Sequence, residues 1–289
     1  MAIMANSIAT ATAIADLAVP LLSRTVVLAP TVLRVAQRNY SGTGGTVSVR
    51  IRNTRTANVQ ATPGAALTAV DVAETLVDVV VNHVYDLANL TEHDLTLGLA
   101  DFGAQILEPQ VDSVAARMDQ YVADAMNDLA ADVTLTAPDA DAWLSAILDA
   151  GMTLDIQNVP EGGRFVAVSP QVARALIGHP AVLDASASGS PSAFRSAVIG
   201  QLAGFTLVKA NQLAADSMVA YHQSAFAMAS FAPLPASGAD SAVVTRDGYA
   251  LRVVRQYNPS TATEQSLVSV FAGASLLDGN RVVRVVKSA

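Results

Sequence analysis

The sequence contains no cysteine, only two lysines, and few charged side chains. The absence of cysteine excludes disulfide bonds, cysteine metal sites and cysteine nucleophiles. Charged residues make up 15% of the chain, well below the roughly 25% that is usual for soluble domains. With 52% hydrophobic residues, such a chain must hide much of its outside from water, which favours large subunit contacts. An ordinary alanine-rich bacterial protein fits this composition equally well.

Motifs for catalysis are also missing. The sequence has no GxxxxGK[ST] phosphate loop, no GxSxG nucleophile elbow and no HExxH metal motif. His83, Glu92, His93 and Asp94 lack the spacing of a metal site, so surface or helix-start roles are favoured for them. Aromatic residues are only 5%, and no zinc finger or aromatic–basic pattern indicates a nucleic-acid module. We therefore expect no catalytic site, no metal and no cofactor.

The opening segment, MAIMANSIATATAIADLAVPLL, is apolar like a secretory signal. It differs from one because no basic residue precedes Arg24 and because Asp16 lies inside the apolar run. No uninterrupted apolar run is long enough to span a bilayer. We therefore expect a soluble protein that is made in the cytoplasm.

The net charge of −8 is unevenly distributed. Residues 1–55 contain six arginines and one acidic residue, a net of +5, so the remaining chain carries −13. An asymmetry of this kind indicates a partner, either nucleic acid or the acidic body of another copy of the chain. Because an acidic chain as a whole repels phosphate, we favour the second partner.

The N-terminal half predicts mixed structure. Residues 1–40 indicate a short helix and an extended arm, and residues 72–85 favour a strand over a helix. Residues 41–67 predict a long polar β-hairpin, because Thr46–Arg52 alternates polar and apolar side chains and Pro63-Gly64 breaks the return. This hairpin has too few apolar residues for a core of its own, so it must lie on something else to be ordered.

A long helix is predicted to follow, running from a capping box at Thr91 and Asp94 towards residue 129, with a new segment from Pro109. Its apolar side is formed by Leu107, Val111, Val114, Met118, Tyr121, Val122 and Leu129. Glu108, Asp112 and Asp119 form a separate acidic stripe. This stripe is either a solvated helix face or a rail that receives the basic hairpin of a neighbour.

The C-terminal half predicts a compact α+β unit followed by strands. The expected helices are Asp139–Ala150, ended by Gly151, then Ser169–Gly178, and a short one at 225–230; the expected strands are 164–168, 218–222 and a strand–turn–strand around Gly204. Trp143 is expected in the core of this unit, and an exposed loop is expected at 185–192. In the tail, residues 240–289, Asp247-Gly248 and Asp278-Gly279 predict hairpin turns.

In their order, these segments resemble the tailed-bacteriophage major capsid proteins with the Hong Kong 97 fold. The resemblance covers nearly the whole chain. It is carried by residues 33–49, by NLTEHDL at 89–95, by NVPEGGR at 158–164 with VAVSP at 166–170, by IGQLAGFTLV at 199–208 with Asn211, and by His222 with Ala225, Ala227 and Ala229. Each motif is short, and the specific signal is their order and spacing.

The resemblance implies an α+β fold with five parts. These are an N-terminal arm (1–40), an extended β-hairpin loop (41–67), a peripheral domain with a long spine helix (68–135), an axial domain (136–235) and C-terminal strands that return to the peripheral domain (236–289). It also implies a structural protein that is not an enzyme. Copies would assemble into hexamers and pentamers and form an icosahedral shell around double-stranded DNA in a virion, built in the bacterial cytoplasm.

The arm and loop of this family clasp adjacent subunits, so our interface hypothesis places Arg50, Arg52 and Arg55 against the acids of the stripe. Some members of the family cross-link through a lysine in the extended loop. Residues 41–67 contain no lysine, so we expect non-covalent contacts and a decoration protein as a further candidate partner.

Only about forty residues precede the hairpin, which favours a separate scaffolding protein; a portal protein is a further expected partner. Two alternatives remain. One is the shell of an encapsulin-type nanocompartment, and the other is a small oligomeric α+β enzyme or binding protein.

Overall fold

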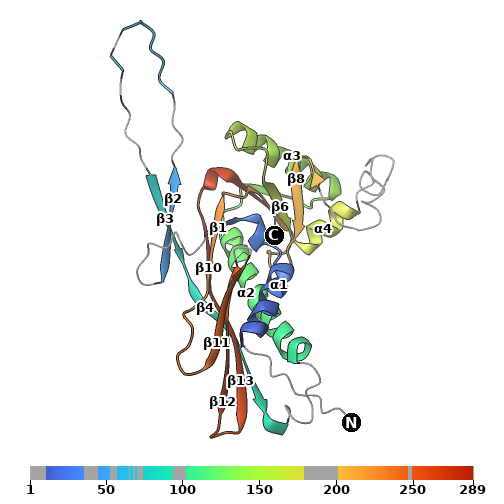
Figure 1. Ribbon diagram of the computed structural model, residues 1–289. Coiled ribbons are helices and arrows are strands. Elements are labelled where there is room, and N and C mark those ends of the chain that lie inside the picture. Colours follow the sequence, from blue (N-terminus) through green and yellow to red (C-terminus); the bar gives the residue numbers. More distant parts are fainter. Residues whose placement is uncertain are drawn as a thin grey trace.

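The computed structural model describes residues 11–35, 45–52, 57–64, 66–67, 69, 74–93, 102–178, 201–246 and 249–288. Two six-stranded sheets, four α-helices and a projecting two-stranded hairpin make up this part of the chain (Figure 1). Within these ranges, no helix is both long and apolar enough to cross a membrane.

The first sheet is built around the longest strand, β13. Its members are β1 (Leu33–Val35), β4 (Asn82–Thr91), β10 (Phe226–Phe231), β11 (Asp240–Arg246), β12 (Tyr249–Asn258) and β13 (Thr263–Leu276). On one side β13 pairs first with β12 and then with β10, and on the other side it pairs with β4; all three pairs are antiparallel. The sheet therefore joins residues from both ends of the chain.

Two helices cover this sheet, α1 (Ala11–Thr25) and α2 (Glu108–Asn127). Pro109 lies in the first turn of α2, where a missing N–H costs nothing, and Glu108 complements the positive end of the helix. A π-helical turn, Gly103–Leu107, precedes it. Both the helix start near Pro109 and the apolar side predicted from the sequence are confirmed.

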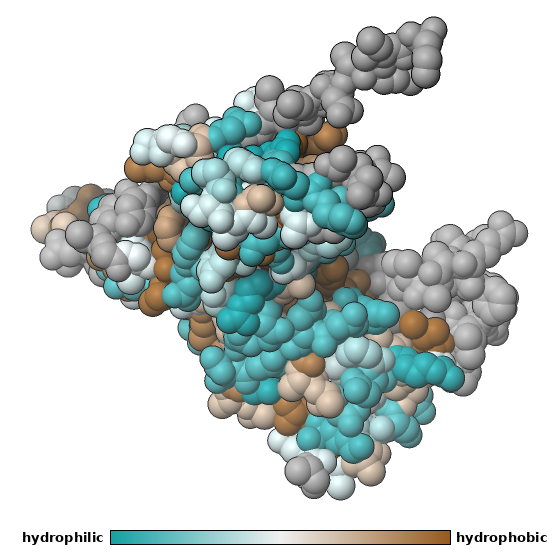
Figure 2. All heavy atoms as spheres, turned by 90° about the horizontal axis from the view of Figure 1, so that it is seen from below, coloured by the Kyte–Doolittle hydropathy of each residue, from teal (hydrophilic) through white to brown (hydrophobic). Residues whose placement is uncertain are grey.

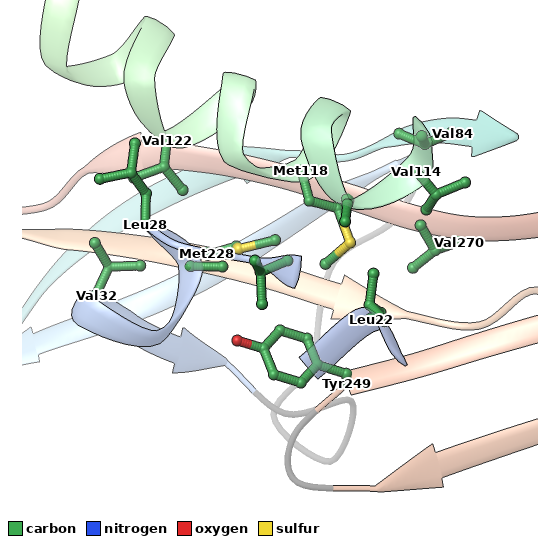
Figure 3. Packing of buried hydrophobic residues seen from close by; sticks show 14 of the residues in the cluster. Leu22, Leu28, Val32, Val84, Val114, Met118, Val122, Met228, Tyr249 and Val270 are labelled. Carbon is green, nitrogen blue, oxygen red and sulfur yellow. The ribbon is translucent and has the colours of Figure 1, made fainter. Parts of the chain in front are cut away.

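The main core lies between α1, α2 and the sheet (Figure 3). Leu22 of α1 and Met118 of α2 point towards one another, with Tyr249 of β12 closing one side. The N-terminal segment from residue 11 to residue 35 is thus part of the core of its own subunit, where the sequence indicated a short helix leading into an extended arm.

The second sheet has the order β5-β14-β9-β6-β8-β7. Its strands are β5 (Val133–Leu135), β6 (Arg164–Val168), β7 (Gln201–Leu202), β8 (Phe205–Lys209), β9 (Ser217–His222) and β14 (Val282–Lys287). Helices α3 (Ala140–Ile156) and α4 (Pro170–Ile177) cover one face, and the other face packs on the main core. β9 is buried on both faces for this reason. Trp143 is in the core between α3 and this sheet, as predicted.

A separate hairpin projects from the body (Figure 1). Strand β2 (Thr46–Arg52) pairs antiparallel with β3 (Glu74–Val80) over seven residues. The return strand therefore starts at Glu74 and lies beyond the limit of residue 67 given for the loop. The base of the hairpin is apolar: Val47, Val49 and Val79 are buried against β10. A core at the base was not expected from the sequence.

The close approach of two backbones fixes this base. A Cβ added to Gly273 of β13 would lie 1.9 Å from the carbonyl oxygen of Val80, at the point where the chain passes from β3 to β4. Only glycine permits this contact. Val81 N–H also donates to the Gly45 carbonyl oxygen at 2.9 Å, which joins the ends of the two hairpin strands next to this contact.

Three expectations from the sequence are wrong. Helix α3 continues through Gly151 to Ile156. Gly151 is explained by packing instead of by a helix end, since a Cβ added to it would lie 3.3 Å from the ring of Phe205. Residues 226–231 form the strand β10, paired on both edges by β1 and β13, instead of a short helix. Asp278-Gly279 begins a 3₁₀ turn that connects two different sheets instead of a hairpin turn, and β14 pairs in the second sheet.

Other expectations are confirmed or lie outside the described residues. The strands at 164–168 and 218–222, the turn around Gly204, the Pro170 helix start with its Gly178 end, and the start of α3 at Asp139, which is its N-cap, are confirmed. Residues 94–101, 185–192 and the Asp247-Gly248 turn are outside the described ranges. The five-part division of the chain stays a prediction.

The two sheets are connected through a polar junction at His222, the last residue of β9. Its Nε2–H donates to the Gly162 carbonyl oxygen at 3.0 Å, and its Nδ1 accepts from Ser224, 2.8 Å from the hydroxyl oxygen. Arg281, in the turn before β14, donates to the same hydroxyl at 2.7 Å. The crossings from β9 to β10 and from β13 to β14 therefore meet here. Burial lowers the pKa of His222, and the nearby arginines Arg281 and Arg164 lower it further, against the effect of the Gly162 bond.

We predict that Gly273→Ala destabilises the subunit by about 2 kcal/mol, because the new methyl group must displace the Val80 backbone. Urea unfolding of the purified subunit measures this change, and limited proteolysis shows whether the hairpin base opens first. Gly279→Ala is the matched control, since a Cβ there meets nothing within 4 Å. Equal stabilities for the two variants would contradict the role of this contact.

We also predict that the stabilising effect of His222 depends on pH. Because its pKa is lowered in the folded state, its contribution is present above its ordinary pKa and is lost as pH falls through the folded value. The difference in melting temperature between the wild type and His222→Asn should therefore be larger at pH 8 than at pH 5. A difference that is the same at both pH values would show that His222 does not titrate in this range.

Candidate functional site: a subunit interface

The projecting hairpin carries the arginines of the predicted interface. The Arg50 side chain is 72% exposed, and its Nη1 lies 3.5 Å from Glu74 Oε2 of the return strand. An exposed pair of this kind contributes less than about 1 kcal/mol, so Arg50 remains available to another partner. The Arg52 side chain and all of Arg55 lie outside the described residues.

The return strand changes the charge of the hairpin. Residues 46–80 contain three arginines, at 50, 52 and 55, but also three acids, at 71, 74 and 78, so this part of the chain has no net charge. On β3, Asp78 accepts a hydrogen bond from Ser48 at 2.6 Å. The positive charge is thus concentrated near the far end of β2 and is not spread over the hairpin.

Two acids of the predicted stripe on α2 are exposed. Glu108 lies at the helix start, and Asp112 follows one turn later and accepts a hydrogen bond from Thr25 of α1 at 2.9 Å. Asp124, near the other end of α2, lies about 120° away from Asp112 around the helix and accepts from Gln120 at 2.7 Å. Glu108 and Asp112 can therefore meet a basic partner, as hypothesised.

Asp119 differs from its neighbours in the stripe because it is buried, with 2% of its surface exposed. Its carboxylate accepts three backbone N–H groups, from Val27 at 2.6 Å and from Leu28 and Ala29 at 3.0 Å each. These amides precede and open the 3₁₀ turn Ala29–Thr31. The carboxylate thus holds the N-terminal segment on α2 of its own subunit. We therefore remove Asp119 from the proposed interface.

Burial raises the pKa of Asp119, and the three backbone hydrogen bonds oppose this effect. Nearby, the Thr31 and Tyr221 hydroxyl oxygens are 2.5 Å apart, and burial raises the pKa of Tyr221 strongly. These polar groups form a hydrogen-bonded set inside an apolar core. Such sets are costly when one member is removed, because the remaining groups lose their partners.

A surface groove of about 610 Å³ lies between β4 and α2. His83 and Tyr85 line it from β4, and Ser113, Arg117 and Tyr121 are among the residues that line it from α2. The His83 and Tyr85 rings stack with centroids 5.4 Å apart, and the Arg117 guanidinium lies 4.8 Å from the centre of the Tyr121 ring. The groove thus has an aromatic lining and one cation.

Large apolar side chains are exposed in several places. On the face seen in Figure 2, hydrophobic patches alternate with hydrophilic residues. Over the described chain, the most exposed include Val59 and Leu67 in the hairpin loop, Leu76 on β3 and Leu234. A stripe on α3 combines Leu148, Met152 and Ile156 at helical spacing, each more than half exposed. This distribution suits a protein that buries several separate surfaces against neighbours.

Groups suited to catalysis do not gather in the described residues. There, no three His, Cys, Asp or Glu side chains are arranged to hold a metal ion. The histidines His83 and His222 are occupied by ring stacking and by the junction between the sheets.

Comparisons with known proteins find similarity to solved structures only. No family model matches the sequence, and no curated protein matches it. Several solved structures are similar to it. A chain of Mycobacterium phage Che8 is 21% identical, with a TM-score of 0.66 and 90% of each chain covered. The capsid of Cyanophage P-SCSP1u is 14% identical, with a TM-score of 0.63, covering 89% of this chain and 86% of that one.

The chain has the fold of a phage capsid protein. The α+β class and the resemblance predicted from the sequence are confirmed at this level. A virus-like particle from Pyrococcus furiosus is also similar, at 11% identity and a TM-score of 0.57, covering 94% of this chain and 97% of that one. The fold is thus found in both the phage capsids and this particle.

Sequence reasoning missed the groove and the role of Asp119. By helical spacing alone, Asp119 cannot be told from the exposed acids of the stripe. The signal that distinguishes it is its neighbours on the helix surface, Ala115 one turn before and Val122 one turn after, which are both apolar. The groove has no sequence signal, because the free edge of a strand depends on which strands pair elsewhere.

We predict that Asp119→Ala lowers the free energy of unfolding by about 3 kcal/mol, since three backbone amides would lose a charged acceptor. Asp112→Ala, on the exposed part of the same helix, should change it by less than about 0.5 kcal/mol. Urea unfolding of both variants tests the contrast. Similar losses in the two variants would refute the distinction between a buried anchor and an exposed acid.

Proposed function

We propose that this chain is the structural subunit of a phage capsid. Copies assemble into hexamers and pentamers and then into an icosahedral shell that encloses double-stranded DNA in a virion. The observation that carries the proposal is the match to phage capsid structures over about 90% of both chains. The subunit has no enzymatic role in this proposal and needs no cofactor.

The hairpin supports a role in assembly. Its base is held on the body by Val47, Val49 and Val79, whereas residues 57–64 beyond the strands are exposed and have no regular secondary structure. An ordered element that projects without covering apolar residues gains stability by lying on another subunit. The hairpin therefore grips a neighbouring copy.

Charge contributes to this grip. Arg50, Arg52 and Arg55 face the acids Glu108 and Asp112 on α2 of a neighbour. The contacts are non-covalent, because residues 41–67 contain no lysine that could cross-link. A separate scaffolding protein, a portal protein and a decoration protein complete the proposed set of partners, and assembly takes place in the bacterial cytoplasm.

A second candidate function has the same fold and a different cargo. The similarity to the virus-like particle from Pyrococcus furiosus favours it. In that case the shell is an encapsulin-type nanocompartment and encloses a protein instead of DNA. Nuclease-protected DNA inside purified particles would support the capsid, and a co-purifying protein cargo would support the compartment.

The proposal is tested by producing the chain with and without co-expressed phage assembly proteins and imaging the product by electron microscopy. Closed shells are expected, which dissociate to a single band on a denaturing gel. A small oligomer of fixed size under every condition would overturn the shell function, and a ladder of covalent oligomers would overturn the non-covalent contacts.

We predict that the triple reversal Arg50→Glu, Arg52→Glu and Arg55→Glu yields soluble subunits and few closed shells, because the hairpin would then repel an acidic neighbour. The matched control replaces the same three arginines by lysine and should assemble. Adding Glu108→Arg and Asp112→Arg to the reversed hairpin should restore shells. Normal particles from the triple reversal would sink the charge hypothesis.

A further inference from the structure

Strand β4 has one edge, beside the groove, along which no described strand pairs. Among the described strands, β4 pairs only with β13, so no described strand occupies its other edge. Such an edge presents a row of backbone donors and acceptors and is a template for pairing with a further strand. The groove lies at this edge, since residues 83 to 85 of β4 line it together with α2.

A segment of the hairpin loop has the pattern of a strand without being one. Residues 57–62, ANVQAT, alternate between Ala57, Val59 and Ala61 on one side and polar residues on the other. They are exposed, they are uncharged, and Val59 is 89% exposed. Pro63 ends the segment, because proline lacks the N–H that a ladder requires.

The segment cannot reach the groove of its own subunit. Strands β2 and β3 pair over seven residues, roughly 23 Å at 3.3 Å per residue, and carry residues 57–62 beyond their far end. Strand β4 leaves from the near end, at Asn82, and runs away from the loop (Figure 1). Only a second copy can therefore bring this segment to this edge.

We infer that residues 57–62 of one copy add a strand to the free edge of β4 in a neighbouring copy. Backbone hydrogen bonds hold the segment, and Val59 enters the groove beside Ala116 and the Tyr121 ring of α2. One face of the added strand is apolar and rests on the helix, and its polar face meets solvent. This inference rests on the proposed assembly function and names the surface that receives the hairpin.

The chemistry of the two surfaces agrees. An uncharged segment leaves Arg117 in place over the Tyr121 ring, whereas a lysine or arginine in the segment would be repelled there. The acids Asp112 and Asp124 lie on α2 on either side of the groove residues, where the arginines that precede the segment can approach them. Backbone pairing would then supply the affinity of the contact, and the arginines would set the register of the added strand on β4.

Disulfide trapping tests the inference cleanly, because the natural chain contains no cysteine. Val59→Cys and Ala116→Cys are combined in one chain, particles are assembled under reducing conditions and then oxidised, and a non-reducing gel is run. A ladder of dimers and higher oligomers is expected. Each single variant and the pair Leu234→Cys with Ala116→Cys are controls and should stay monomeric on the gel.

The outcomes separate this inference from the proposed function. Particles of the double variant without a ladder would overturn the inference and leave the shell function standing. Absence of particles from the wild type would overturn both. If the cysteine pair itself blocks assembly, the variants Val59→Asp and Val59→Ile are compared instead. A tenfold or larger loss of particles for Val59→Asp, but not for Val59→Ile, supports the inference. Equal yields of particles from the two variants overturn it.

Discussion

The contact between the Val80 carbonyl oxygen and Gly273 is the constraint on which the projecting hairpin depends. It lets the chain leave β3, cross close over β13 and enter β4 at once. The valines on either side of this crossing are buried against β10. The hairpin therefore leaves the body in a fixed direction. A rigid base is a precondition for gripping a neighbour, because a freely moving loop would lose more conformational entropy on docking.

The body that carries the hairpin depends in turn on α2. One side of this helix packs on β13 and β4, and Asp119 binds the backbone amides of Val27, Leu28 and Ala29. A buried carboxylate is costly to desolvate, and its three hydrogen bonds to backbone amides offset that cost. The N-terminal segment is thereby fixed on the same helix whose opposite face borders the groove.

The sequence predicted those parts of the fold whose signal is local. The apolar side of α2, the proline start of α4 and the turn at Gly204 depend on neighbouring residues, and they are confirmed. Residues 225–230 were predicted as a short helix, and alanine and methionine do favour one, but pairing on both edges makes residues 226–231 a strand. Gly151 suggested a helix end, although a packing contact with Phe205 accounts for it.

The candidate interface could be predicted only in part, for the same reason. Its charged members are visible in the sequence, but their balance depends on where the hairpin returns. With β3 as the return strand, the three arginines are matched by three acids within residues 46–80. Net charge then gives the hairpin little overall attraction to an acidic body. The contact must depend more on local pairing of arginines with acids, and on the backbone and apolar contacts that an uncharged segment can make with the free edge of β4.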